Sequence, residues 1–100
     1  MEKISINKEG KSKEEIIRCI ENMVSDYGKE IKENNILIKR EENKYHISAN
    51  KNILFINFWI KAIITASDNE IILEFDTNAP KRYQNEALEM LRKMVNEVCN

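Results

Sequence analysis

Few residues of this 100-residue chain are of the types that carry out chemistry. The sequence holds one histidine, His46, and two cysteines, Cys19 and Cys99. A structural zinc site uses about four cysteine or histidine ligands, so these residues do not assemble one and we expect no metal. Nucleophilic catalysis requires a nucleophile, a base and an orienting group that converge in a pocket. We find no such motif, and we predict no catalytic residue, no cofactor and no enzymatic activity.

The same three residues have ordinary structural interpretations. Cys19 lies beside the apolar stripe of a predicted helix, and Cys99 is one residue from the end of the chain. We interpret them as two unpaired thiols in a reducing compartment. His46 is expected on the solvent side of a strand.

Two adjacent cations, Lys81 and Arg82, stand where a last helix is expected to begin. Thr77 or Asn78 can cap that helix, and Pro80 is tolerated in its first turn. Cations at a helix N-terminus oppose the helix dipole, whereas the free amides of the first turn bind anions. Two interpretations stay open, a pair of solvated side chains and an anion-binding site at Lys81 and Arg82.

The strongest candidate binding surface is a set of apolar residues at alternate positions of a long predicted strand, residues 53–66. Phe55, Trp59 and Ile63 share one face of that strand, and Ile72 continues the face on the next strand. The opposite face already points to the helices, so these four residues should form an exposed patch. Such patches mark interaction sites, and tryptophan dominates their energetics. The alternative is that the strand coils and residues 29–35 or the sheet itself cover this face.

The long strand is expected to return through a hairpin. Asp68 and Asn69 separate two apolar runs, which is a hairpin signal. A two-residue loop pairs Ala66 with Ile71, Ile64 with Leu73, Ala62 with Phe75 and, on the other face, Lys61 with Asp76. Leu54, Ile56, Phe58 and Ile60 then extend the apolar face toward the helices. Fourteen residues at about 3.3 Å each exceed the size of such a domain, so the strand should bend near Asn57 or Lys61.

The other elements follow from local patterns. Residues 2–7 read as a short strand, and Ser12 with Glu15 forms a capping box for a helix from about 13 to 27. Gly28 is expected to end that helix in the left-handed conformation, before a polar connection over residues 29–35. A second hairpin pairs 36–38 with 45–47 through either a two-residue loop, Glu41-Glu42, or a three-residue loop with Asn43 in the left-handed conformation, and its register stays open. Residues 50–52 are expected to turn the chain into the long strand.

The last helix is expected to run to about residue 97. Its apolar stripe comprises Tyr83, Ala87, Met90, Leu91, Met94 and Val98. The order is therefore strand, helix, four strands, helix (β-α-β-β-β-β-α) in a single domain over residues 1–100. We predict a two-layer α+β fold with an antiparallel sheet of about five strands and both helices on one face.

Composition and charge argue against several classes of function, although a local basic patch is not excluded. Sixteen basic and seventeen acidic residues give a formal net charge of −1, so no global field favours nucleic acid or an anionic membrane. The first residues lack the basic flank and apolar core of a signal peptide. The longest apolar run is interrupted by Asn57 and Lys61 and is too short to span a bilayer as a helix. We expect a cytoplasmic protein with no membrane partner.

The strand at Ile4-Ser5-Ile6, the helix from Glu14 to Tyr27, the 62–75 hairpin and the last helix together resemble the polyhydroxyalkanoic acid system proteins. The resemblance covers nearly the whole chain in topology and spacing and implies a non-enzymatic protein. That family follows its last strand with a leucine- and phenylalanine-rich turn, whereas this chain has residues 78–82. The chain is also similar in element order to the double-stranded-RNA-binding domain, with Lys81 and Arg82 at the matching place.

The function expected from the sequence is therefore protein–protein interaction through the exposed face of the sheet. The partner is either a second copy or a host protein. One alternative is an inhibitor encoded by a phage or plasmid, of the anti-CRISPR or immunity type. Another is a nucleic-acid or anion binder that uses the start of the last helix.

Overall fold

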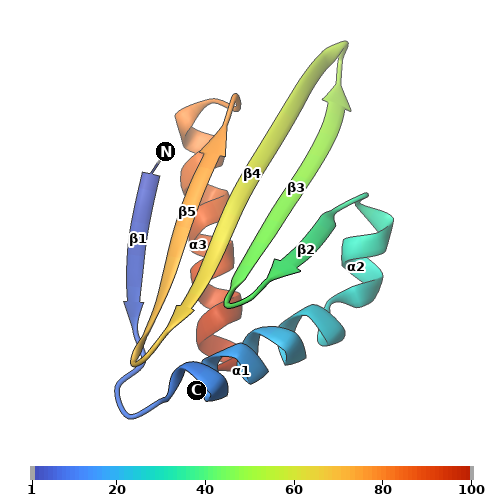
Figure 1. The fold of residues 1–100 in the computed structure, drawn as a ribbon. Helices are drawn as coiled ribbons and strands as arrows, with labels where there is room; N and C mark the ends of the chain where they lie inside the picture. Colours follow the sequence, from blue (N-terminus) through green and yellow to red (C-terminus); the bar gives the residue numbers. More distant parts are fainter. Residues whose placement is uncertain (1, 100) are drawn as a thin grey trace.

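Five antiparallel strands form one sheet in the computed structural model, which describes residues 2–99 (Figure 1). The strand order across the sheet is β1-β5-β4-β3-β2. The elements in chain order are β1 (Glu2–Asn7), α1 (Lys13–Asp26), α2 (Gly28–Glu33), β2 (Leu37–Glu41), β3 (Lys44–Ile53), β4 (Ile56–Ser67), β5 (Glu70–Thr77) and α3 (Lys81–Val98). The predicted α+β class with an antiparallel five-stranded sheet is confirmed.

The hairpin predicted at Asp68 and Asn69 is present in the expected register. All four predicted pairs between β4 and β5 form, including Ile64 with Leu73 and Lys61 with Asp76. Asn69 has a φ of 64°, a conformation that asparagine adopts more readily than most residues. The turn also meets the first helix, because Asp68 Oδ1 accepts a hydrogen bond of 2.8 Å from the Lys13 amide.

The core lies between one face of this hairpin and helix α1. The capping box is confirmed: the Glu15 amide donates to Ser12 Oγ at 3.2 Å, and the Ser12 hydroxyl lies 3.3 Å from Glu15 Oε1. The stripe of α1 and the inward residues of the strands are buried together. The buried core comprises Ile16, Ile20, Met23, Tyr45, Ile64, Ala66, Ile71, Leu73, Val95 and Cys99.

The chain after α1 differs from the prediction. Gly28 does not adopt a positive φ, and it begins the short helix α2 instead of ending α1 in the left-handed conformation. The segment expected as a polar connection is therefore helical up to Glu33, and Asn35 takes the left-handed conformation, with a φ of 53°. Ile31 explains the difference, because it faces a cavity between the helices and the sheet and gives α2 an apolar contact.

The second hairpin has a register that neither expected loop gives. Glu41 pairs with Lys44, and Ile38 pairs with Ile47, so the two loop residues are Glu42 and Asn43. Glu42 has a φ of 56°. Asn43 holds this turn to the neighbouring strand, since its side-chain amide donates to the Ala66 carbonyl at 2.8 Å.

The long strand predicted over residues 53–66 is two strands joined by a tight turn. The expected turn at residues 50–52 is wrong, because these residues belong to β3, which continues to Ile53. The chain reverses at Leu54 and Phe55, and β4 begins at Ile56. The expected bend near Asn57 or Lys61 is therefore not needed, since the turn removes the excess length.

Helix α3 packs through its C-terminal half. Leu91 and Met94 contact the core and Val95 is buried, whereas Tyr83 and Met90 of the predicted stripe are exposed. The side chain of Val98 lies outside the described part of the chain. Pro80 occupies the N-cap position, so neither Thr77 nor Asn78 caps the helix as predicted. In Figure 1, α3 lies behind the sheet. Residues 2–99 contain three helices where two were expected. None of the described helices is long and apolar enough to cross a membrane.

Candidate functional site

The hairpin of β3 and β4 extends beyond the rest of the sheet. Strand β2 pairs with β3 only as far as Ser48, and β5 pairs with β4 only as far as Ile60. Residues 50–59, here called the arm, pair with each other from Asn50 and Trp59 to Ile53 and Ile56. Figure 1 shows the arm rising past the ends of the neighbouring strands. Its projection is consistent with a longest molecular dimension of 46 Å against 25 and 23 Å for the other two.

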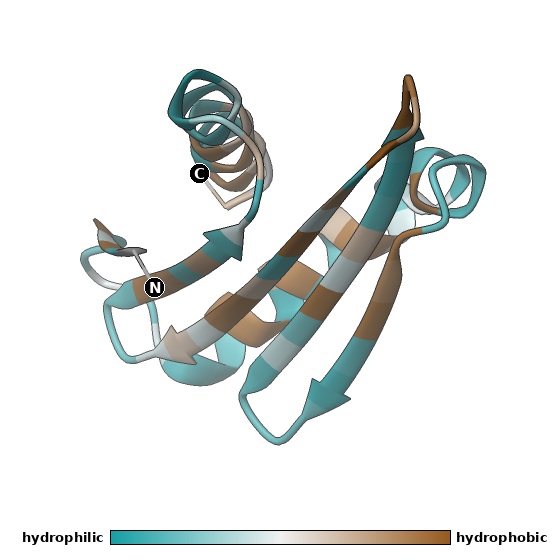
Figure 2. Cartoon of the chain, turned by 90° about the horizontal axis from the view of Figure 1, so that it is seen from above, coloured by the Kyte–Doolittle hydropathy of each residue, from teal (hydrophilic) through white to brown (hydrophobic). Residues whose placement is uncertain are grey.

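The tip of the arm is apolar and exposed. Four consecutive residues, 53–56, form the tip, and it is the apolar end of the arm in Figure 2. The exposed fractions are 45% for Ile53, 86% for Leu54, 107% for Phe55 and 56% for Ile56. Large apolar residues are normally exposed singly, so four in succession at a projecting point make the tip a candidate contact surface.

The backbone of the turn supports the same conclusion. Leu54 and Phe55 have φ values of 50° and 69°, and two-residue hairpin turns with positive φ at both positions favour asparagine and glycine. The left-handed conformation costs a residue with a Cβ atom roughly 1–2 kcal/mol. Leu54 and Phe55 thus occupy positions where asparagine and glycine would be more stable. Strain of this kind clusters at functional sites.

The base of the arm is held by polar side chains at the end of β5 and immediately after it. The Trp59 amide donates to Asn78 Oδ1 at 2.8 Å, and Asn78 Nδ2 donates to the Asn57 carbonyl at 2.8 Å. Thr77 Oγ1 donates to the Trp59 carbonyl at 2.6 Å. The side-chain amide of Asn78 therefore bonds backbone groups of β4 that a neighbouring strand would otherwise pair with. These bonds fix the direction in which the arm projects.

The charges on this hairpin are all positive. Lys44, Lys51 and Lys61 are its charged residues, and no aspartate or glutamate occurs from residue 44 to residue 67. Lys51 stands in the middle of the β3 edge that β2 leaves open. A lysine there discourages the addition of another strand. The open edge of β3 is therefore poorly suited to the addition of another strand.

The predicted patch of Phe55, Trp59, Ile63 and Ile72 does not lie on a single face. Phe55 is in the turn, and Trp59 is half-buried with the Lys61 ammonium 5.7 Å from its ring centre. Ile63 and Ile72 are half-buried on the face of the sheet away from the core. Lys61 separates Trp59 from Ile63 on that face. The predicted alternation of side chains between the two faces of the sheet breaks at Leu54, because a two-residue turn interrupts the strand there.

The sheet face that carries Ile63 is mixed in character. Ile63 stands between His46 and Glu74 on the adjoining strands, and His46 Nε2 lies 3.6 Å from Glu41 Oε2. His46 is half-buried on the face away from the core, as expected. Polar neighbours of this kind divide the apolar area. The tip of the arm thus presents the more continuous apolar surface.

Leu54 and Ile56 were expected to point toward the helices. Ile53 pairs directly with Ile56, and the side chains of Ile53 and Ile56 therefore lie on the side of the sheet that faces the core. The arm, however, projects beyond the helices, so Leu54 and Ile56 are exposed. The sequence pattern gives the correct side for Ile56 but not its burial.

An apolar cavity lies on the helix side of the sheet. Its volume is about 100 Å³, and residues of all three helices and of β2, β3 and β4 line it. Ile31 comes from α2, Ile47 from β3 and Leu91 from α3. Apolar cavities of about 150 Å³ bind benzene. This cavity is smaller, so it has room for part of an apolar side chain and not for a whole aromatic ring.

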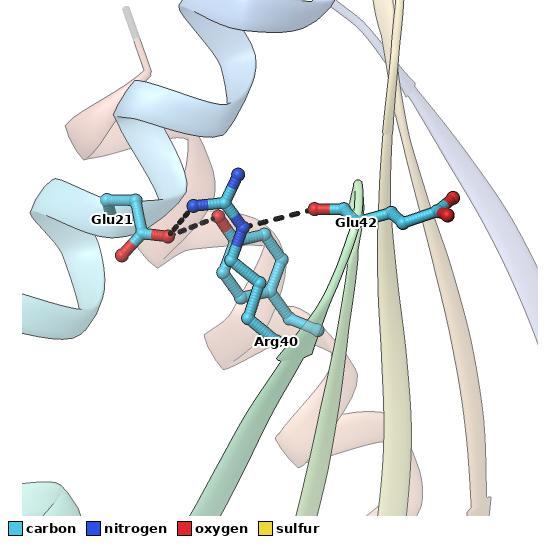
Figure 3. Close-up of polar contacts among 4 residues, drawn as sticks. Glu21, Arg40 and Glu42 are labelled. Carbon is cyan, nitrogen blue, oxygen red and sulfur yellow. Dashed lines mark hydrogen bonds and ion pairs between the residues drawn. The ribbon is translucent and has the colours of Figure 1, made fainter.

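A polar cluster joins α1 to the second hairpin (Figure 3). Glu21 Oε1 accepts a hydrogen bond of 2.7 Å from the Tyr45 hydroxyl and lies 3.0 Å from Arg40 Nη1. Arg40 Nε also donates to the Glu42 carbonyl at 3.1 Å. Burial, followed by the hydrogen bond and the negative charge of Glu21, raises the pKa of Tyr45 to about 12. The cluster has the contacts of a structural site, because its hydroxyl is satisfied and its tyrosine ring is in the core.

We expect Tyr45→Phe to lower the free energy of unfolding at neutral pH by about 1 kcal/mol, because one hydrogen bond is lost. In the wild type the folded state binds the phenolic proton more tightly than the unfolded state, whose tyrosine pKa is 10.0. This stabilisation is complete below pH 10 and is lost as the pH rises toward 12. Urea titrations across this range should show a steeper decline for the wild type than for Tyr45→Phe. Equal declines would contradict the assignment.

The remaining predicted residues lie apart from the arm tip. Lys81 and Arg82 are exposed in the first turn of α3, and the Arg82 guanidinium lies 5.5 Å from the ring centre of Tyr83. Cys19 and Cys99 lie at the contact between α1 and α3 and are not in the arm. Within residues 2–99 no three metal-ligating side chains are grouped to hold an ion.

No protein-family model and no curated protein matches this chain. Among solved structures, the chain is similar to a TBP-like protein from Parabacteroides distasonis ATCC 8503, with a TM-score of 0.56 and 22% sequence identity. The similarity covers 74% of this chain and 51% of that chain, so this protein spans about half the length of the structure it matches. At this identity the similarity concerns the fold. The chain thus shares its α+β architecture with a solved TBP-like structure.

Proposed function

We propose that this protein is a non-enzymatic binding protein that acts by protein–protein interaction through the tip of its arm. The observation that carries the proposal is the run of four exposed apolar residues around two left-handed positions, Leu54 and Phe55. The proposal keeps Phe55 and Trp59 of the expected surface. The centre of the proposed contact surface is the tip, and no longer the sheet face that carries Ile63 and Ile72.

We propose a second copy of the chain as the partner. The apolar tip and the apolar cavity are complementary in character, and both belong to the same molecule. A net charge of −1 gives little repulsion between copies. Two copies related by a two-fold axis would each place a tip against the other's cavity, which closes the assembly.

The energetics favour two reciprocal contacts over one. Full burial of an apolar side chain of this size contributes about 1.5–3 kcal/mol, and only part of each tip residue enters the partner. Association itself costs about 4–15 kcal/mol in lost freedom and ordering. One tip against one cavity therefore gives weak binding, whereas two tips contribute twice the burial for a single association cost.

Sedimentation analysis over a range of concentrations tests the proposal. The wild type should show a reversible monomer–dimer equilibrium, and Phe55→Asp should remain a monomer because the charge would be buried unpaired. Leu37→Asp is the matched control, since Leu37 is 71% exposed on β2 and outside the tip. It should dimerise as the wild type does. A wild type that stays monomeric, or equal losses in both variants, would overturn the second copy as partner.

A second candidate is binding to nucleic acid through the arm. The observation in its favour is that the hairpin carries lysines, no acidic residue, and Asn50, Asn52 and Asn57 beside an apolar tip. Proteins that bind the DNA minor groove use such side chains and insert apolar wedges. Fluorescence anisotropy of a labelled duplex at low salt tests this, with Lys51→Ala and the Lys81→Ala/Arg82→Ala double variant. Salt-dependent binding that is lost in Phe55→Asp but unaffected by protein dimerisation would favour this candidate.

A further inference from the structure

An open groove, here called the outer groove, crosses the face of the sheet that points away from the core. Three consecutive residues from each of three adjacent strands line it, 37–39 of β2, 46–48 of β3 and 61–63 of β4. The middle residue of each set points toward the core, so the other six side chains form the groove. Its volume of about 560 Å³ is within the range of roughly 300–1,000 Å³ that small-molecule sites occupy.

The strand register arranges these six side chains in two rows across the sheet. One row is Leu37, Ser48 and Lys61, and the other is Lys39, His46 and Ile63. The two lysines are therefore at diagonally opposite corners of the groove, and the two apolar residues are at the other corners. Because adjacent strands are about 4.8 Å apart, a ligand about 10 Å across would contact all three strands.

The lysines of the outer groove lack a carboxylate partner. Of the ion pairs formed among residues 2–99, none involves Lys39 or Lys61. Asp76 stands beside Lys61 in the register of β4 and β5, but the Lys61 ammonium lies over the Trp59 ring instead, 5.7 Å from its centre. The residues that line the groove include no aspartate and no glutamate. The groove therefore carries an excess of positive charge, which attracts anions.

The side chains between the two lysines suit a ligand that is partly apolar. The Ser48 hydroxyl has no hydrogen-bond partner within residues 2–99, so it is free to donate to an anion. Glu41 is directed to His46, whose Nε2 lies 3.6 Å from Glu41 Oε2, and this acid therefore leaves the lysines without a counter-charge. Leu37 is 71% exposed and Ile63 is half-buried, and both offer apolar surface beside the charges.

We propose that the outer groove binds a small amphipathic anion, in which a carboxylate, sulfonate or phosphate group is joined to an apolar body. The anionic group lies over Ser48, because the flexible stems of Lys39 and Lys61 allow both ammonium groups to reach that position. The apolar body covers Leu37 or Ile63. Charge-assisted hydrogen bonds are stronger than neutral ones, so the anionic group distinguishes this ligand from a neutral apolar molecule. The groove and the apolar cavity are on opposite sides of the sheet, so the inference does not depend on self-association through the arm.

Fluorescence titration of the full chain with anilinonaphthalene sulfonate tests the proposal, because this probe joins an aromatic body to one anionic group. Phenylnaphthylamine, the same molecule without the sulfonate, is the matched uncharged probe. The sulfonate should bind about tenfold more tightly or better, as charge-assisted hydrogen bonds predict. Lys39→Gln and Lys61→Gln should each weaken sulfonate binding by about fivefold or more and leave binding of the uncharged probe unaffected. Lys51→Gln, on the arm and outside the groove, is the control and should change neither affinity.

The backbone amide signals in NMR spectra locate the bound probe. On addition of the sulfonate, the signals of residues 37–39, 46–48 and 61–63 should shift, and they should shift equally in Phe55→Asp because the tip is not part of the groove. Equal affinity for the two probes, or equal losses in Lys39→Gln and Lys51→Gln, would overturn the proposal. Shifts confined to the tip or to the residues that line the apolar cavity would also overturn it, because the probe would then bind only to apolar surfaces outside the groove.

Discussion

Replacing Leu54 with asparagine and Phe55 with glycine is expected to raise the free energy of unfolding of the monomer by about 2 kcal/mol. Both residues have positive φ in the turn between β3 and β4. Asparagine and glycine suit these positions, so the folded backbone loses its strain. The same change removes two apolar side chains from the tip and should weaken self-association by a factor of about ten or more.

Urea denaturation in dilute solution measures the first effect, and sedimentation analysis measures the second. Ser67→Ala serves as a control at the end of the neighbouring hairpin, outside the tip, and should change neither quantity strongly. A double variant that is less stable than the wild type would contradict the assignment of a strained turn. A more stable variant with unchanged self-association would separate the turn geometry from the proposed contact.

Replacing Ile64 with alanine should lower the free energy of unfolding by about 2–5 kcal/mol, as expected for a buried large-to-small change. Ile64 is fully buried and stands between Tyr45 and Leu73 in the sheet. Because a domain of this kind has a total stability of about 5–15 kcal/mol, the variant should be close to unfolding at elevated temperature.

The adjacent Ile63 provides the matched comparison. It is on the same strand, points to the opposite face and is half-buried. Ile63→Ala should therefore cost clearly less, about 1 kcal/mol. Chemical denaturation of the two variants measures the difference. Equal losses would mean that the two faces of the sheet are buried to the same extent, contrary to the structure.

The hairpin from Ala62 to Phe75 could be predicted because two patterns agreed on its register. The apolar residues alternate with period two on both sides of Asp68 and Asn69, and the same register pairs Lys61 with Asp76. Helix α1 was predictable from its capping box for a similar reason, since the Ser12–Glu15 signal is local. Where the deciding interactions are within a few residues, the sequence is sufficient.

The turn at Leu54 and Phe55 could not be predicted from turn chemistry, because neither residue favours positive φ. One signal was present. Asn52 and Asn57 are equally distant from the turn and pair with each other, and Asn50 pairs with Trp59 further down the arm. That symmetry marks a hairpin, but the continuous run of apolar residues favours an unbroken strand.

The start of α2 at Gly28 depends on a tertiary contact. The helix is supported by the apolar contact of Ile31. This contact does not arise from residues close in sequence. Of the arm residues, Phe55 and Trp59 belonged to the surface predicted from the sequence, whereas Ile53, Leu54 and Ile56 were assigned to the interior of a strand.

Photo-crosslinking from position 55 tests the central claim most directly. A benzophenone amino acid in place of Phe55 sits at the most exposed point of the tip, so it should not disturb folding. Irradiation of the self-associated protein should give a covalent dimer, with crosslinks to peptides that line the apolar cavity, such as those containing Ile31 or Leu91. Crosslinks confined to other surfaces, or no covalent dimer under conditions where sedimentation shows association, would contradict the account.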